Sequence, residues 1–196
     1  MKIAIFGGSF DPLHAGHTQI VDVSLKSLPI TKLIVLPAFL SPFKQKYMLS
    51  SRARLLSVKK AFHKKNKVII SNYELTKNQK SSTYKSVLHL QKKYSPTKIY
   101  LIIGADNAPS LHKWGSFAKL KSKVTFCIIA RDKINIKKTL QKKIKFHTIN
   151  IRNKNSSSTI KQDGNQKPIP IGARSYYKQQ EQTNQHSTND HARESR

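Results

Sequence analysis

The chain has 196 residues and a formal net charge of +28, from 37 lysines and arginines against nine acidic residues. This length suffices for one domain with a substantial core, and a hydrophobic fraction of 37% argues against a disordered chain. No apolar stretch approaches the length of a membrane span, and the first residues read as a strand rather than a signal peptide, so a membrane protein is not expected.

The strong positive charge has two interpretations. A basic surface could bind nucleic acid, a membrane or acidic substrates, or lysine could simply be the usual solvated residue. The lysines are scattered over most predicted helices and loops, without the interleaved aromatic residues of RNA-binding modules. We therefore favour a solvated surface that also attracts polyphosphates. A basic nucleic-acid-binding protein is the alternative from a different class, and steep salt dependence of RNA binding would support it.

Apolar runs and helical spacings alternate along the chain. Strands are predicted at residues 3–6, 32–36, 67–71, 99–103, 124–130 and 145–151. Helices are predicted at residues 15–28, 51–64, 83–94 and 136–143. This alternation predicts an α/β fold: a Rossmann-like doubly wound parallel sheet of order 3-2-1-4-5, with a sixth strand and helices on both faces.

The domain is predicted to cover residues 1–178. Residues 179–196 form a polar tail, which we expect to be disordered. The single cysteine, Cys127, lies within an apolar run and is expected to be a buried structural thiol. One cysteine cannot form an internal disulfide, which suits a reducing cytoplasm as the expected location.

The first strand runs into the most informative motif, residues 7–17, which reads GGSFDPLHAGH. Gly7 and Gly8 let the backbone turn sharply and approach a ligand closely. His14 is expected just before the next helix and His17 in its first turn, where free N–H groups and the helix dipole attract anions. Each histidine alone more often caps a helix or fills a core. Together they predict a phosphate site that matches neither the Walker A loop nor the dinucleotide fingerprint.

Further segments are predicted to reach the same edge of the sheet, because ligands in such folds bind where the strand order reverses. After the fourth strand, Gly104 permits a close approach and Asp106 suits a ribose hydroxyl or a metal-bound water. Trp114 could stack on a flat heterocycle or simply pack against the core. After the second strand, the loop of residues 37–44 brings Lys44 to this edge.

Near the end of the chain, residues 155–162 read NSSSTIKQ. Serines before a helix are ordinary N-caps. A helix start that carries serine and lysine is equally suited to clamp a triphosphate, and the segment alone does not decide between the two.

Taken together, these segments resemble the bacterial nicotinate-nucleotide adenylyltransferase family, within the nucleotidyltransferase superfamily. The similarity spans about residues 1–178 and includes the stretch from Glu74 to Thr83. The segments that carry it are residues 7–17, residues 37–44, residues 104–106 with Trp114, and residues 156–161.

The resemblance implies an enzyme that transfers AMP from ATP to nicotinate mononucleotide, giving nicotinate adenine dinucleotide and pyrophosphate in NAD biosynthesis. The nucleophile is an anionic phosphate oxygen, so the site needs positioning and charge stabilisation rather than a general base. Mg²⁺ is expected with ATP, held mostly by phosphates and water, and no protein metal site is predicted. The expected partners are these two small molecules, with neither membrane nor specific nucleic acid, and a homo-oligomer is compatible with the sequence.

The resemblance also assigns roles to residues. In the catalytic set, His14 and His17 would hold ATP phosphates as charge builds, and Lys44 and Lys161 would neutralise the leaving pyrophosphate. The implied ATP-binding set is Gly7, Gly8, Ser9, Phe10, His14, His17, Gly104, Asp106, Ser157, Ser158 and Lys161. The implied set for the nicotinate nucleotide is Gly8, Ser9, Phe10, Lys44, Thr83 and Trp114. In this set Trp114 would stack on the pyridine ring and Thr83 would approach its carboxylate.

Three positions depart from the family pattern. Lys161 replaces an arginine, which keeps the charge but loses the bidentate fork, so lower turnover or ATP affinity is expected. Phe43 replaces a histidine, and Ser82 stands where tyrosine is usual. The preference for nicotinate rests on the resemblance, and adenylyltransferases for nicotinamide mononucleotide or phosphopantetheine are the nearest alternatives.

Overall fold

The computed structural model describes residues 1–40, 47–77, 79–130, 142–151, 174–175 and 178. Six parallel strands form one sheet in the order β3-β2-β1-β4-β5-β6, which confirms the predicted order and the sixth strand. The strands are β1 (Lys2–Gly8), β2 (Lys32–Pro37), β3 (Val68–Ile70), β4 (Lys98–Gly104), β5 (Thr125–Ala130) and β6 (Phe146–Asn150). The helices are α1 (Ala15–Ser27), α2 (Ser51–Phe62), α3 (Tyr73–Thr76), α4 (Thr83–Tyr94), the 3₁₀ helix η1 (Ala105–Lys113) and α5 (Phe117–Lys123).

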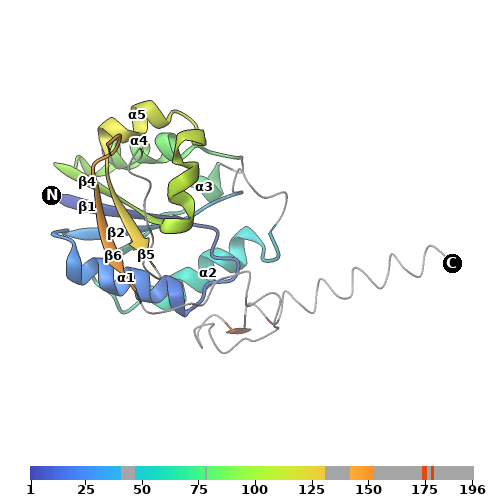
Figure 1. The fold of residues 1–196 in the computed structure, drawn as a ribbon. Coiled ribbons are helices and arrows are strands. Elements are labelled where there is room, and N and C mark those ends of the chain that lie inside the picture. The colour runs from blue at the N-terminus through green and yellow to red at the C-terminus, as the bar shows by residue number, and fades with distance from the viewer. Residues whose placement is uncertain (41–46, 78, 131–141, 152–173, 176–177, 179–196) are drawn as a thin grey trace.

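Helices cover both faces of the sheet, with α1 and α2 on one side and α4 and α5 on the other (Figure 1). Side chains alternate between the faces because the strand repeat is two residues. Along β1, Ala4 and Phe6 join the core that α1 and α2 cover, whereas Ile3 and Ile5 join the core beneath α4 and α5. Burial on both faces explains why these strands read as continuous apolar runs.

Some local predictions needed correction. No helix was predicted directly after the fourth strand, where η1 begins, and the helices α3 and α5 were not predicted. Both missed helices are short, and Leu120 is the one buried residue of α5, too few for a periodic pattern. The predicted helix at 136–143 lies almost entirely outside the described residues, and residues 142 and 143 form a turn. The tail at 179–196 also lies outside them.

The sheet register brings the segments that follow β1, β2 and β4 to the same edge of the sheet. Gly8, the last residue of β1, pairs with Pro37 at the end of β2. On the other side of β1, the pairing of Phe6 with Ile102 leaves both strands two residues to run, to Gly8 and Gly104. From this point one connection leads outward to β2 and the other to β5, so β1 and β4 flank the position where the strand order reverses.

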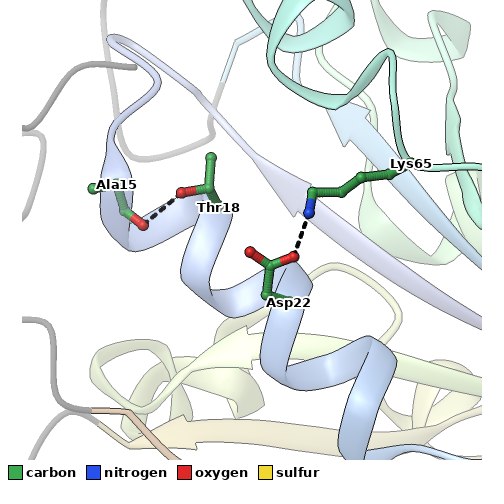
Figure 2. A network of polar contacts seen from close by, with 4 residues as sticks. All are labelled: Ala15, Thr18, Asp22 and Lys65. Atoms are coloured by element: carbon green, nitrogen blue, oxygen red, sulfur yellow. Dashed lines mark hydrogen bonds and ion pairs between the residues drawn. The ribbon is translucent and has the colours of Figure 1, made fainter. Parts of the chain in front are cut away.

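A polar network ties α1 to the chain that follows α2 (Figure 2). Lys65 Nζ lies 2.6 Å from Asp22 Oδ1, and Thr18 Oγ1 donates to the Ala15 carbonyl at 2.9 Å. The side chains of Lys65 and Asp22 are 33% and 44% exposed, so this ion pair contributes at most about 1 kcal/mol. The fold is therefore stabilised chiefly by its two apolar cores.

The lone thiol lies in the middle of β5, where Cys127 pairs with Ile102 of β4 and His147 of β6. It is fully buried, as predicted, and burial raises the pKa of the Cys127 thiol from 9.0 to about 12. Within the described part of the chain, no helix combines the length and apolar character that crossing a bilayer requires.

Candidate active site

The two motif histidines lie where the sequence predicted, at the start of α1. His14 is the N-cap, and its Nδ1 accepts the backbone N–H of Gly16 at 3.1 Å. His17 lies in the first turn, and its Nδ1 accepts the backbone N–H of His14 at 3.2 Å. The two rings lie 3.8 Å apart between centroids. The motif therefore folds by hydrogen-bonding its own helix start.

These contacts fix the tautomer of both rings. A nitrogen that accepts an N–H carries no proton, so each neutral imidazole has its proton on Nε2. His14 and His17 thus present Nε2–H groups as donors, next to the positive end of the α1 dipole. His14 is buried and His17 is half-buried, so His17 is the more exposed of the two residues. This arrangement suits anionic oxygens such as those of phosphates.

Phe10 supports His17 from within the core. Its ring is fully buried, lies edge-on to Phe6 with centroids 5.5 Å apart, and lies 4.9 Å from the ring of His17. A Cβ at Gly8 would come within 3.2 Å of this ring, so glycine leaves the space that the phenyl needs. Since the side chain of Phe10 is buried, any substrate contact of this residue would use its backbone.

Asp11, a motif residue without a predicted role, anchors the segment before α2. Its carboxylate accepts the backbone N–H groups of Met48 at 3.1 Å and Leu49 at 2.8 Å. The residue is fully buried, so its oxygens serve the fold rather than a substrate. The cis peptide between Asp11 and Pro12 lies in the same turn.

Arg54 of α2 is a further residue that the sequence interpretation missed. It is 1% exposed, and its guanidinium carbon lies 4.2 Å from the ring centroid of Tyr47. Desolvation lowers the pKa of Arg54, while Tyr47 and Asp11 oppose this shift, and the guanidinium stays charged. One signal could have found it. The buried positions of α2 are Arg54, Ser57, Val58 and Phe62, so Arg54 lies on the apolar face of that helix.

The turn after β4 carries Gly104, Asp106 and Trp114. A Cβ at Gly104 would overlap Asp106 Oδ1, so the exposed carboxylate folds back over this glycine. Trp114 follows η1, is half-buried and packs against the core beneath α4. A Cβ at Gly115 would lie 3.4 Å from Ser82 Cβ, which places the Trp114 turn against the start of α4.

The structure therefore brings several predicted site residues together at the carboxyl edge of the sheet. Gly7 and Gly8 end β1 and Ser9 follows it, while Gly104 ends the adjacent strand β4 and Asp106 follows that strand. Thr83, the first residue of α4, lies next to the Trp114 turn. Lys44, Ser157, Ser158 and Lys161 lie outside the described residues. Among the described residues, no group of three or more His, Cys, Asp or Glu could hold a metal ion.

Comparisons with known proteins identify the family. A family described as cytidylyltransferase-like matches residues 5–163. The probable nicotinate-nucleotide adenylyltransferase of Campylobacter fetus is 42% identical over 163 residues, which cover 83% of this chain and 87% of that protein. The chain belongs to the nicotinate-nucleotide adenylyltransferase family. A relative of the same name from Aliarcobacter butzleri is 41% identical over 170 residues, covering 87% of this chain and 91% of that protein.

Solved structures support the fold of this family member. Plasmodium falciparum nicotinic acid mononucleotide adenylyltransferase complexed with NaAD has a TM-score of 0.68 and 24% identity, covering 82% of both chains. The structure of that enzyme complexed with APC has a TM-score of 0.69 and 22% identity, covering 89% of this chain and 93% of the other. At these identities the likeness speaks for the architecture, and the family assignment rests on the bacterial relatives.

Proposed function

We propose that the protein transfers AMP from ATP to nicotinate mononucleotide, releasing pyrophosphate and forming nicotinate adenine dinucleotide. The observation that carries this proposal is the histidine pair at the start of α1, whose Nδ1 atoms are held by backbone N–H groups. The helix that carries this pair follows β1 directly, at the point where the strand order reverses. The bacterial relatives named for this activity supply the substrate class.

The reaction needs no base, because the attacking oxygen belongs to the phosphate of the mononucleotide and is already anionic at neutral pH. The oxygen attacks the α-phosphorus of ATP. The bond between the α-phosphorus and the oxygen that bridges it to the β-phosphate breaks, and pyrophosphate leaves. His14 and His17 donate to phosphate oxygens as negative charge builds, and their fixed orientation avoids reorganisation. Lys44 and Lys161 are proposed to neutralise the departing pyrophosphate.

The pyridine end of the substrate is assigned to the Trp114 turn and the start of α4. The indole of Trp114 provides a flat face for the pyridine ring. The first N–H groups of α4, near Thr83, suit a carboxylate because a helix N-terminus favours negative charge. An amide in the same place would also need an acceptor. These features favour nicotinate over nicotinamide.

Mg²⁺ is proposed to arrive with ATP as part of that substrate. This ion keeps several waters and is commonly held by phosphates with one or two carboxylates. Asp106 is an exposed carboxylate in the first turn of η1, just after β4, and could accept hydrogen bonds from such waters or from a ribose hydroxyl. Gly7, Gly8 and Ser9 would then line the path of the mononucleotide past β1.

The test is pyrophosphate release from Mg²⁺ and ATP with nicotinate mononucleotide, nicotinamide mononucleotide or phosphopantetheine, measured side by side. The expected result is turnover of the nicotinate compound with at least about tenfold higher kcat/KM, the scale of one lost polar contact in a pocket. Preference for either other acceptor would replace the proposed substrate. Absence of turnover with all three, together with salt-dependent RNA binding, would overturn the proposal.

A further inference from the structure

Two consecutive residues beyond β2, Ala38 and Phe39, have backbone groups that interact with other parts of the chain. The Ala38 N–H donates to the Gly8 carbonyl at 2.8 Å. The carbonyls of Ala38 and Phe39 both accept from Arg54, and burial raises the pKa of Glu74 against an opposing contribution from the Phe39 N–H. This turn is therefore fixed from both sides, although it lies outside regular secondary structure.

Arg54 holds one side of the turn. Its Nη1 donates to the carbonyls of Ser9 at 2.9 Å and Ala38 at 2.6 Å. Its Nη2 donates to the Phe39 carbonyl at 3.1 Å and to Ser51 Oγ at 3.2 Å. A single buried fork thus joins the loop after β1 to the turn after β2. Lysine has only three donors on one nitrogen and cannot reproduce four bonds in this geometry.

Glu74 holds the other side. This carboxylate in α3 is 8% exposed and accepts from Ser86 Oγ at 2.6 Å, and it interacts electrostatically with the Phe39 N–H. Ser86 lies in the first turn of α4, the helix whose start lies against the Trp114 turn. The peptide of Phe39 therefore connects the phosphate side of the proposed site to its pyridine side.

We propose that Arg54 and Glu74 are positioning residues for the transfer reaction. Both hold the turn of Ala38 and Phe39, and this shared grip fixes the loop that carries Ser9 relative to the start of α4. Neither side chain reaches the surface, so neither is expected to touch substrate. This inference rests on the proposed function for its kinetic consequence. The grip itself, a buried cation and a buried carboxylate on two neighbouring peptides, can be tested without turnover.

The kinetic test compares Arg54→Lys and Glu74→Gln with wild type, below the melting temperature and per folded molecule as judged by circular dichroism. Displaced substrate loops should lower kcat/KM by about 10- to 100-fold in Arg54→Lys, with a changed KM for both substrates. Glu74→Gln should change kcat/KM in the same direction by less. A purely structural role would lower the active fraction and leave KM unchanged, which would overturn the proposal.

The matched control is Arg52→Lys, two residues earlier on the exposed face of α2, which should leave both KM values unchanged. The double variant Arg54→Lys with Glu74→Gln should lose less than the product of the single losses, because both side chains act on one turn. Independent, multiplicative losses would contradict a shared grip.

Hydrogen exchange supplies a readout that does not depend on the substrate. The amides of Ala38 and Phe39 should exchange faster in Arg54→Lys and in Glu74→Gln, while those in the middle of β5 keep wild-type protection. If wild type fails to turn over the proposed substrates, only the proposed function fails, and exchange still tests the grip. Unchanged protection in both variants would overturn it. Glu74→Gln keeps the test decisive if Arg54→Lys does not fold.

Discussion

The loop after β1 and the turn after β4 leave the sheet from adjacent strands, yet the fold holds them by different means. Buried polar groups fix the first: Asp11 holds the segment before α2, Arg54 holds the Ser9 carbonyl, and the histidines bind their own helix start. The second begins η1 without a side-chain cap, and Asp106 is exposed. Donors that stabilise charge must be oriented before the reaction. Contacts with ribose and ring leave more freedom, so the fixed geometry fits the proposed role of the first region in binding phosphate.

The largest expected effect tests the fixed side. His17→Ala should lower kcat by about 100-fold, the range for removing one donor that acts in the transition state. Steady-state release of pyrophosphate measures it. The control is His63→Ala, since His63 is an exposed residue at the end of α2 and should give wild-type rates. A near-wild-type rate in His17→Ala would remove this residue from the mechanism and erase the distinction between the two regions.

A smaller effect is expected on the other side. Trp114→Ala should raise KM for the pyridine nucleotide about tenfold, the scale of one base stacked on an aromatic ring, and should raise KM for ATP less. Trp114→Phe, which keeps a flat ring, should lie between Trp114→Ala and wild type. Equal changes for both substrates would mean that Trp114 only packs against the core beneath α4.

A Cβ added at Gly104 would overlap the Asp106 carboxylate, and this gives a second test of the turn after β4. Gly104→Ala should displace the Asp106 carboxylate and lower kcat/KM about fivefold, as for one lost hydrogen bond of about 1 kcal/mol. Gly104 has φ −68° and ψ 148°, which any residue adopts, so the backbone itself tolerates alanine. The double variant with Asp106→Ala should be no worse than Asp106→Ala alone. Additive losses would show that the methyl group acts elsewhere.

The smallest effect concerns stability, beneath the start of α4. Desolvation raises the pKa of Glu74 above its ordinary 4.5, against opposing contributions from the Ser86 hydrogen bond and the Phe39 N–H. Because the native state then binds the proton more tightly than the unfolded state, this contribution is present below pH 4.5 and lost as pH rises through the raised pKa. The stability advantage of wild type over Glu74→Gln should therefore shrink from pH 4 to pH 8. Denaturant unfolding measures it, and a constant or widening difference would contradict it.

Sequence patterns predicted the sheet well for a physical reason. Strands buried on both faces give unbroken apolar runs, and α4 follows the predicted 83–94 because its apolar residues recur at helical spacing. The 3₁₀ helix η1 was not predicted because its asparagine, serine and Pro109 are typical of loops. In addition, its tighter turn does not produce a 3.6-residue repeat.

The same limit applies to the site. His14 and His17 could be placed from the sequence because their partners lie within three residues, inside one motif. Arg54 could not be placed in this way, because the Ser9 carbonyl that it binds lies 45 residues away. Every residue has a backbone carbonyl, so the residue type at position 9 does not mark it as a partner. Glu74 was noted only as part of a similar stretch, and its partner Ser86 is 12 residues further along. Contacts between side chains and remote backbone leave no periodic signal.

The rate at which the thiol at the centre of β5 reacts with an alkylating reagent reports how often the native structure opens. Alkylating reagents attack thiolates, and in the native state Cys127 is both inaccessible and held protonated. With one cysteine in the chain, each molecule takes up a single label, and only when β5 separates from its neighbours. A nucleotide that binds the native state at about 100 times its Kd should slow labelling by about 100-fold. Substrate affinity thus becomes readable from a reagent that never enters the site.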